Sequence, residues 1–122
     1  MVLVVEDDAD SSDIMARFLK RLGFEVRCAA TAVEALDAMK GAPVRVAILD
    51  FNLPDHDGLW LLRQMNDDPD LAEVRAIFVS GTFTHETARQ AIDLGAAEWF
   101  IKGVHSVSRV METVERLHGP KE

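Results

Sequence analysis

A chain of 122 residues, of which 48% are hydrophobic and 28% charged, is long enough to fold as one domain, residues 1–122, without metal or disulfide staples. Its net charge of −8 should repel DNA, RNA and anionic lipid, so direct nucleic-acid binding is not expected. No apolar run approaches the ~20 residues that span a bilayer, and the short apolar start lacks the positively charged region of a signal peptide. The single cysteine, Cys28, has no second cysteine with which to form a disulfide. We therefore expect a cytoplasmic protein with no membrane segment.

The first expected element is a strand at residues 2–5, because four consecutive apolar residues are typical of a strand buried on both faces. A helix follows and ends at Gly23, and a second strand is expected at 24–29. Thr31 and Glu34 form a capping box ahead of the second helix, which precedes a third strand at 44–49. The apolar positions at helical spacing in the first three helices are Ile14, Phe18, Leu19 and Leu22, then Ala35, Leu36 and Met39, then Leu59, Leu62 and Met65.

The second half of the chain continues this alternation. A fourth strand is expected at 74–79 and a fifth at 97–101, separated by a helix that ends at Gly95 and faces inward through Ala88, Ile92 and Leu94. Strict alternation of buried strands with helices implies parallel pairing and right-handed crossovers. We therefore expect an α/β fold, a three-layer α/β/α sandwich around a five-stranded parallel sheet with (βα)5 flavodoxin-like connectivity. The last helix has its apolar positions at Val107, Val110, Met111, Val114 and Leu117.

Polar side chains follow the expected strands at the points where the strands end. In open α/β sheets ligands bind at this carboxyl edge. Three close carboxylates are costly without a cation, and oxygen ligands suit Mg²⁺. A carboxylate beside Mg²⁺ can attack phosphorus, while the metal and an amine neutralise the transferring group and a hydroxyl hydrogen-bonds it. The residues at the strand ends are Glu6, Asp7 and Asp8, then Asp50, then Ser80, then Lys102.

Over essentially its whole length the chain resembles response-regulator receiver domains, and it is similar to the single-domain, chemotaxis-type regulators among them. The order and spacing of the four matching segments fit the family. These segments are residues 4–8 (VVEDD), 48–58 (ILDFNLPDHDG), 79–81 (VSG) and 100–102 (FIK). The resemblance implies a receiver fold and a signalling module that is not an enzyme, beyond assisting its own phosphorylation and dephosphorylation.

The resemblance also implies a role for each residue of this edge. Asp50 would accept a phosphoryl group from a histidine kinase or a histidine phosphotransfer protein, with Lys102 and Ser80 assisting. Mg²⁺ would be held by Asp7, Asp50 and the backbone carbonyl of Asn52, with Glu6 acting through water. Ser80 and Trp99 would form the switch that signals to a downstream protein or output domain through the face made by the fourth helix, the fifth strand and the fifth helix.

The chain departs from the family pattern at two positions. Gly103 follows Lys102 where the family usually has proline, often with a cis peptide, and glycine is expected to loosen the loop. Trp99 is bulkier than the tyrosine or phenylalanine usual there, so its inward movement on phosphorylation is expected to be hindered.

Two other functions are open to a chain with this pattern. An aspartyl-phosphate phosphatase of the haloacid-dehalogenase type needs an Asp-x-Asp motif, but Asn52 stands in the place of the second acid. A flavin-binding flavodoxin-like domain needs a loop rich in Ser, Thr and Gly after the first strand, where residues 6–8 are acidic.

Some of the polar and aromatic residues have structural interpretations instead. Asp8 and Asp10 are expected to cap the first helix, and residues 57–58 to form a turn and cap. Trp60 is expected either at an interface or partly buried under a loop.

Overall fold

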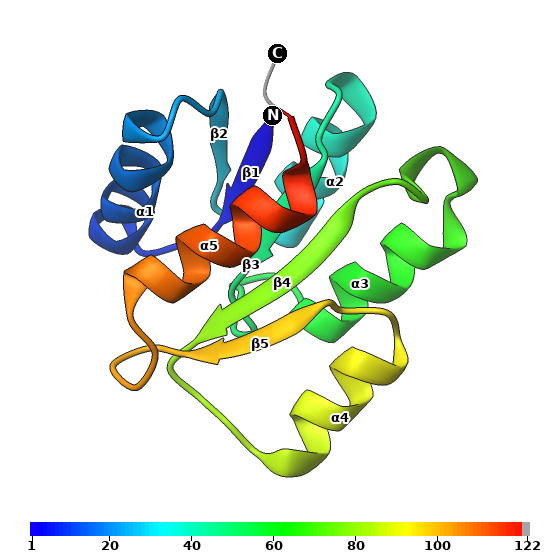
Figure 1. Cartoon of the computed structure of the whole chain (residues 1–122). Helices are drawn as coiled ribbons and strands as arrows, with labels where there is room; N and C mark the ends of the chain where they lie inside the picture. Colours follow the sequence, from blue (N-terminus) through cyan, green and yellow to red (C-terminus); the bar gives the residue numbers. More distant parts are fainter. Residues whose placement is uncertain (121–122) are drawn as a thin grey trace.

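Five parallel strands form a single sheet with the order β2-β1-β3-β4-β5 in the computed structural model, which describes residues 1–120 (Figure 1). The strands are β1 (Val2–Val5), β2 (Val26–Ala29), β3 (Val46–Leu49), β4 (Arg75–Ser80) and β5 (Glu98–Ile101). The helices are α1 (Ala9–Arg21), α2 (Ala32–Gly41), α3 (Gly58–Asp67), α4 (His85–Asp93) and α5 (Val107–His118), with a short 3-10 helix, η1 (Pro69–Leu71). The predicted three-layer α/β/α fold is confirmed.

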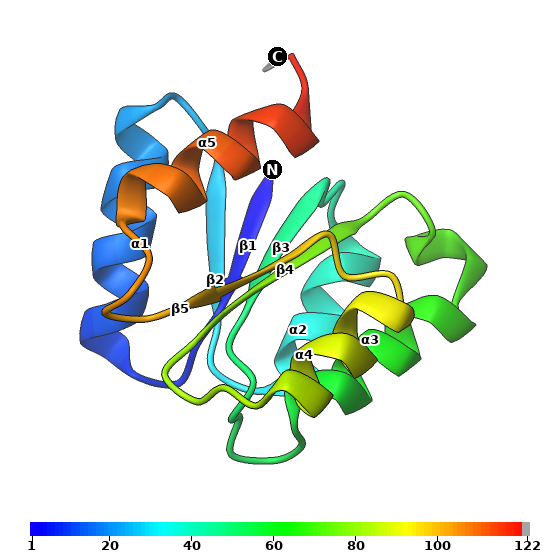
Figure 2. The same cartoon turned by 60° about the horizontal axis from the view of Figure 1, so that its bottom comes forward.

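The helices cover both faces of the sheet, with α1 and α5 on one side and α2, α3 and α4 on the other (Figure 2). Alternate residues of each strand therefore enter different cores. In β1, Val2 and Val4 pack with the core on the α1 and α5 side, whereas Leu3 and Val5 pack with the core on the α2, α3 and α4 side. Because both faces are covered, the central strands are apolar at every position, which is why they stand out in the sequence.

Two helices turn a different face to the sheet from the one that their largest apolar residues suggest. In α4, Ala91 is fully buried and Ile92 is 48% exposed, so the prediction that Ile92 faces inward is wrong. In α1 the buried positions are Ser12, Ala16 and Leu19, while Ile14 and Phe18 are exposed. Small residues let a helix backbone approach the sheet closely. A prediction based on large apolar side chains alone therefore misses the helix face that these small residues form.

The ends of the elements agree with the sequence in most places. Thr31 Oγ1 accepts from the N–H of Glu34 at 3.1 Å and the Glu34 carboxylate accepts from the N–H of Ala30 at 3.0 Å, as a capping box requires. Asp8 occupies the N-cap position of α1, but its carboxylate accepts from the Ser11 hydroxyl at 2.7 Å and not from a helix N–H. Strands β2 and β3 both begin two residues later than predicted. Within residues 1–120, no helix has the length and apolar character needed to cross a membrane.

Candidate functional site

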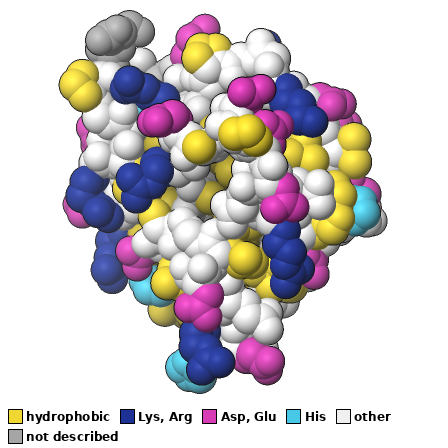
Figure 3. All heavy atoms as spheres, turned by 90° about the vertical axis from the view of Figure 1, so that its right-hand side faces the viewer, with side chains coloured by type: hydrophobic (Ala, Val, Ile, Leu, Met, Phe, Trp, Pro, Cys, Tyr) yellow, Lys and Arg dark blue, Asp and Glu magenta, His cyan; other side chains and the backbone are white. Residues whose placement is uncertain are grey.

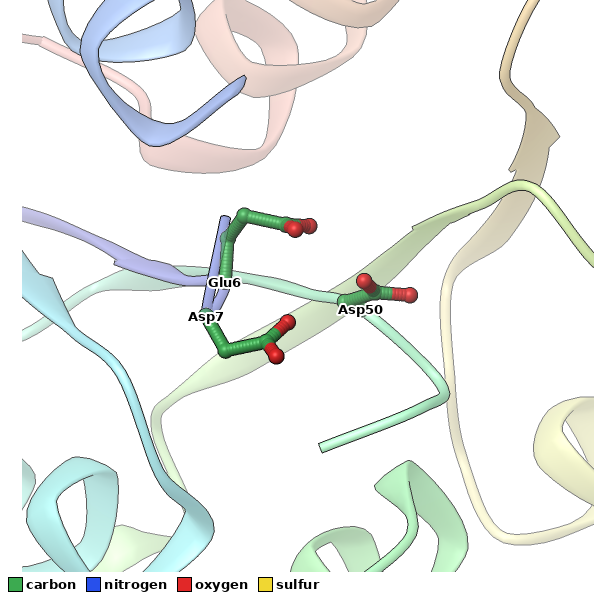
Figure 4. Close-up of side chains that lie close together, drawn as sticks. All are labelled: Glu6, Asp7 and Asp50. Atoms are coloured by element: carbon green, nitrogen blue, oxygen red, sulfur yellow. The ribbon is translucent and has the colours of Figure 1, made fainter. Parts of the chain in front are cut away.

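The strand order reverses between β1 and β3, so their carboxyl ends flank the position where an open α/β sheet binds its ligand. The pairing of Val5 with Leu49 brings the residues that follow side by side, and the N–H of Asp50 donates to the carbonyl of Val5 at 2.9 Å. Figure 4 shows Glu6 and Asp7, at the end of β1, extending toward Asp50 at the end of β3. One carboxylate oxygen from each of these three residues lies within 4.8 Å of the others.

The three carboxylates differ in their access to water. Glu6 and Asp50 are each only 9% exposed, whereas Asp7 is exposed. A set of hard oxygen donors with one open side fits Mg²⁺, which binds a few protein ligands and keeps several waters. Three close negative charges are also unfavourable unless a cation shares them. The predicted Mg²⁺ ligands Asp7 and Asp50 are therefore brought together, with Glu6 beside them.

Lys102 supplies a positive charge to this cluster from the end of β5. Its Nζ lies 2.9 Å from a Glu6 carboxylate oxygen and 3.6 Å from a carboxylate oxygen of Asp50. Burial raises the pKa of Glu6 and the neighbouring Asp50 raises it further, while Lys102 acts in the opposite direction. Burial alone would lower the pKa of Lys102, but Glu6 and Asp50 outweigh it and raise that pKa, so the amine stays charged. In this arrangement Lys102 pairs more closely with Glu6 than with Asp50, the partner that the resemblance implies.

The loop after Lys102 contains hydrogen bonds beside Gly103, and the looseness expected from this glycine stays a prediction. The N–H groups of Val104 and His105 both donate to the carbonyl of Ile101, at 3.1 and 3.0 Å, and the N–H of Ile101 donates to Nδ1 of His105 at 2.9 Å. Gly103 sits in this turn with φ +82°, a conformation that favours glycine. The hydrogen bonds of the loop therefore come from residues on both sides of Gly103, and sequence reasoning did not identify His105.

Ser80, the predicted hydroxyl, is fully buried at the end of β4. Its Oγ lies 3.2 Å from the hydroxyl of Thr82 and accepts from the N–H of Thr82 at 3.3 Å. The side-chain amide of Asn52 donates to the same Thr82 hydroxyl at 3.1 Å. A hydrogen-bonded chain thus connects the loop after β3 with the loop after β4, beside Asp50.

Two aspartates fix the loop that carries Asn52. The Asp55 carboxylate accepts from the N–H groups of Ala32 and Val33, at 2.9 and 3.0 Å, and so anchors this loop to the N-terminus of α2. Sequence reasoning missed this contact. Asp57 accepts from the N–H of Trp60 at 2.8 Å as the N-cap of α3, so the prediction of a turn and cap at residues 57–58 is confirmed.

The two tryptophans both lie on the α3 and α4 side of the sheet. Trp99 is 9% exposed, stacks on Phe78 with 4.8 Å between ring centroids, and lies 5.9 Å from Phe51. Its ring is already turned inward, so its role as a switch stays a prediction. Trp60 is partly buried and stacks on His56 at 3.6 Å, which agrees with partial burial under a loop.

A family model, curated relatives and solved structures all match this chain to response regulators or their receiver domains. The family model for the response regulator receiver domain matches residues 2–115. A putative NtrX-like response regulator of Rickettsia bellii is 38% identical over 103 residues, which cover 83% of this chain and 21% of that protein. The receiver domain of NtrX from Brucella abortus is 33% identical with a TM-score of 0.84, and the match covers 96% of this chain and 97% of that one. A CheY-like receiver domain protein from Methanospirillum hungatei is 28% identical, with a TM-score of 0.86 over 94% of this chain and 90% of that one.

The curated relatives are longer than this chain. The chain covers 21% of the Rickettsia protein, 47% of the transcriptional regulatory protein CrdR of Helicobacter pylori and 50% of the transcriptional regulatory protein AruR of Pseudomonas aeruginosa. The similarity therefore concerns the receiver part of those proteins.

Proposed function

The chain belongs to the response regulator receiver domain family, and from this premise we propose that residues 1–122 form one receiver domain that accepts a phosphoryl group on Asp50. The donor would be a histidine kinase or a histidine phosphotransfer protein, and the reaction would require Mg²⁺. One observation carries this proposal. A nearly buried Asp50 lies at the carboxyl edge of the sheet beside two other carboxylates and within 3.6 Å of the Lys102 amine.

Each residue of the site has a defined part in this transfer. A carboxylate oxygen of Asp50 forms the new bond to phosphorus as the bond from phosphorus to the donor's imidazole nitrogen breaks, and the imidazole leaves. Asp7, Asp50 and the carbonyl of Asn52 would hold Mg²⁺, with Glu6 acting through water. When bound, the ion supplies positive charge that offsets the negative charge of the carboxylates and the incoming phosphoryl group. Lys102 adds a second positive charge, and it exchanges its contact with Glu6 for one with the phosphoryl oxygens.

The signal would leave through Ser80 and the elements next to it. A phosphoryl group on Asp50 offers new acceptor oxygens, and the Ser80 hydroxyl can donate to them by giving up its contact with Thr82. We propose that Ser80 and Trp99 transmit this change to the face formed by α4, β5 and α5, where a downstream protein or output domain binds. The side of the molecule that carries α3 and α4 exposes apolar side chains among mixed charges (Figure 3), and Phe83 and Ile92 are among the exposed apolar residues.

A cytoplasmic location and the absence of direct nucleic-acid binding belong to the same proposal, because histidine kinases donate their phosphoryl groups in that compartment and the net charge is −8. Neither alternative function gains support from the site. Asn52 offers an amide where a phosphatase of the haloacid-dehalogenase type needs an acid, and the acidic end of β1 would repel a flavin phosphate.

The test is phosphorylation by acetyl phosphate, followed by intact mass. With Mg²⁺ the mass should rise by one phosphoryl group, and removal of Mg²⁺ or the substitution Asp50→Asn should abolish the rise. Asp57→Asn is the matched control, because Asn caps a helix as well as Asp does and Asp57 belongs to the same loop. A mass increase that persists in Asp50→Asn would refute the assignment.

A further inference from the structure

The N–H of Ile101 has an unusual partner for the last residue of an edge strand. Among the described strands, β5 pairs only with β4, and the N–H of Lys102 donates to the Ser80 carbonyl at 2.9 Å. Successive N–H groups of a strand point to opposite sides, so the N–H of Ile101 points away from the sheet. It donates to Nδ1 of His105 at 2.9 Å. As the acceptor, this ring nitrogen carries no hydrogen.

His105 binds the other backbone group of Ile101 as well. The N–H of His105 donates to the Ile101 carbonyl at 3.0 Å, so one residue holds both the donor and the acceptor of Ile101. The ring is partly buried and lies edge-on to Phe100, with 5.5 Å between centroids. These contacts define both the position and the orientation of the imidazole.

Lys102 is the residue inside this closed turn. A proline at position 103 would hold φ near −65° and stiffen the chain directly after the lysine, but Gly103 has φ +82°. Apart from Gly103 and its two chain neighbours, no described residue has an atom within 4 Å of the position that a Cβ would occupy. Neither side-chain packing nor a ring therefore restrains residue 103. The restraint on the backbone of Lys102 comes from the β4 pairing on one side and from His105 on the other.

We propose that His105 is a positioning residue for Lys102, because its ring nitrogen holds the N–H of Ile101 and closes the turn that keeps the lysine beside Glu6 and Asp50. This inference rests on the proposed function for its effect on phosphoryl transfer. His105 touches neither the phosphoryl group nor the metal. His105 compensates for the absence of a proline after Lys102 by fixing Ile101, the residue directly before Lys102.

Two substitutions separate the hydrogen bond from the bulk of the ring. His105→Leu keeps apolar volume next to Phe100 but removes the acceptor. His105→Asn restores an acceptor, because Oδ1 of Asn is the same number of bonds from the backbone as Nδ1 of His. His85→Leu is the control, since the His85 ring also lies edge-on to a phenylalanine, Phe83, at 5.1 Å but makes no hydrogen bond among the described residues.

The experiment measures the rate of phosphorylation by acetyl phosphate at saturating Mg²⁺, together with Mg²⁺ affinity. We expect His105→Leu to slow phosphorylation about tenfold, as a small displacement of a charge-bearing group does. We expect His105→Asn to recover most of the rate, and both His85→Leu and the Mg²⁺ affinity of His105→Leu to stay at the wild-type value. An undiminished rate in His105→Leu, a slow His105→Asn, or a parallel loss of Mg²⁺ affinity would each overturn the proposal.

Amide exchange keeps this inference separate from the proposed function. If the wild-type protein takes up no phosphoryl group, the proposed function fails, and exchange at the Ile101 amide then decides the role of His105. Slow exchange of the Ile101 amide in the wild type and in His105→Asn, with fast exchange in His105→Leu, would support the proposed hydrogen bond between His105 and Ile101. Equal exchange in all three would overturn it.

Discussion

A methyl group added at Gly58 would test how closely α3 packs beneath the phosphoacceptor. Gly58 is the first residue of α3, and its N–H donates to the Phe51 carbonyl at 2.7 Å. A Cβ at this position would overlap Cε1 of Phe78 and would lie 3.0 Å from the carbonyl oxygen of Asp50 and 3.1 Å from Cα of Phe51. Two of these three contacts are with backbone, so relief requires the loop that carries Asp50 to move.

The size of the effect follows from which atoms can give way. The Phe78 ring is fully buried and stacked on Trp99, so it has no free space to enter. Overpacking of this kind costs about 1–3 kcal/mol, and the gain in helix propensity from Gly to Ala offsets less than about 1 kcal/mol at a helix end. We expect Gly58→Ala to lower the free energy of unfolding by about 2 kcal/mol. At about 2.1 cal/mol/K per residue of unfolding entropy, this corresponds to a melting temperature lower by about 8 °C.

Thermal and urea unfolding of Gly58→Ala should be compared with Gly41→Ala. Gly41 ends α2 with no positive φ, and outside its chain neighbours and the backbone of its own helix no described atom lies within 4 Å of the position that a Cβ would occupy. Ala there should therefore raise stability by about 0.5–1 kcal/mol. Equal melting temperatures for the two variants would refute the argument that close approach, and not glycine itself, matters at position 58.

Two further predictions concern the carboxylates around the site. Asp55→Ala should destabilise the fold by about 1–2 kcal/mol in urea unfolding, because two N–H groups at the start of α2 lose their acceptor. Burial would raise the pKa of Asp55, but these N–H donors outweigh burial and lower that pKa. The wild type should therefore lose this stabilisation as the pH falls through the lowered pKa of Asp55. In calorimetry, the stability of Asp55→Ala should depend less steeply on pH in the acid range. Asp7→Asn should raise the melting temperature without Mg²⁺, since it relieves repulsion from Glu6 and Asp50, and should weaken Mg²⁺ binding in calorimetric titration. An unchanged Mg²⁺ affinity would show that Asp7 is not a ligand.

The sequence predicts most of the fold because its signals are local. The central strands are buried on both faces, so they appear as unbroken apolar runs, and alternation with helices leaves few topologies. The carboxyl edge follows from the same reasoning, since parallel strands must place the residues that follow them together. Glu6, Asp7 and Asp50 could therefore be grouped before their distances were known.

What the sequence did not predict depends on contacts between distant segments. Asp55 binds N–H groups more than 20 residues earlier in the chain, and nothing in its own neighbourhood identifies α2 as its partner. Lys102 has two acids within reach, and only the packed geometry places its amine nearer to Glu6 than to Asp50. Ile92 occupies a helical position that suits burial, but the close approach of Ala91 to the sheet rotates it into solvent.

The inward position of Trp99 limits how this aromatic can report phosphorylation. Its Nε1 is buried without a hydrogen-bond partner among the described residues, and an unsatisfied donor costs about 1–3 kcal/mol. The stacking on Phe78 and the burial of the ring must offset this cost. Trp99→Phe removes the donor and keeps a stacked ring, so we expect stability within about 1 kcal/mol of the wild type, whereas Trp99→Ala should cost about 3–5 kcal/mol.

Fluorescence can then follow the ring itself in a Trp60→Phe background, where Trp99 is the only tryptophan. A ring that is 9% exposed should be quenched weakly by acrylamide before any activation. Addition of Mg²⁺ and beryllofluoride should therefore lower the quenching only slightly, and Ser80→Ala should remove even that change. Strong quenching that falls sharply with beryllofluoride would show that the free protein populates an outward ring, and the two-state movement of Trp99 would then account for the signal. Quenching that is identical with and without beryllofluoride would contradict a role for Trp99 as a switch, and would leave Ser80, Thr82 and the loop before α4 as the elements that change the output face.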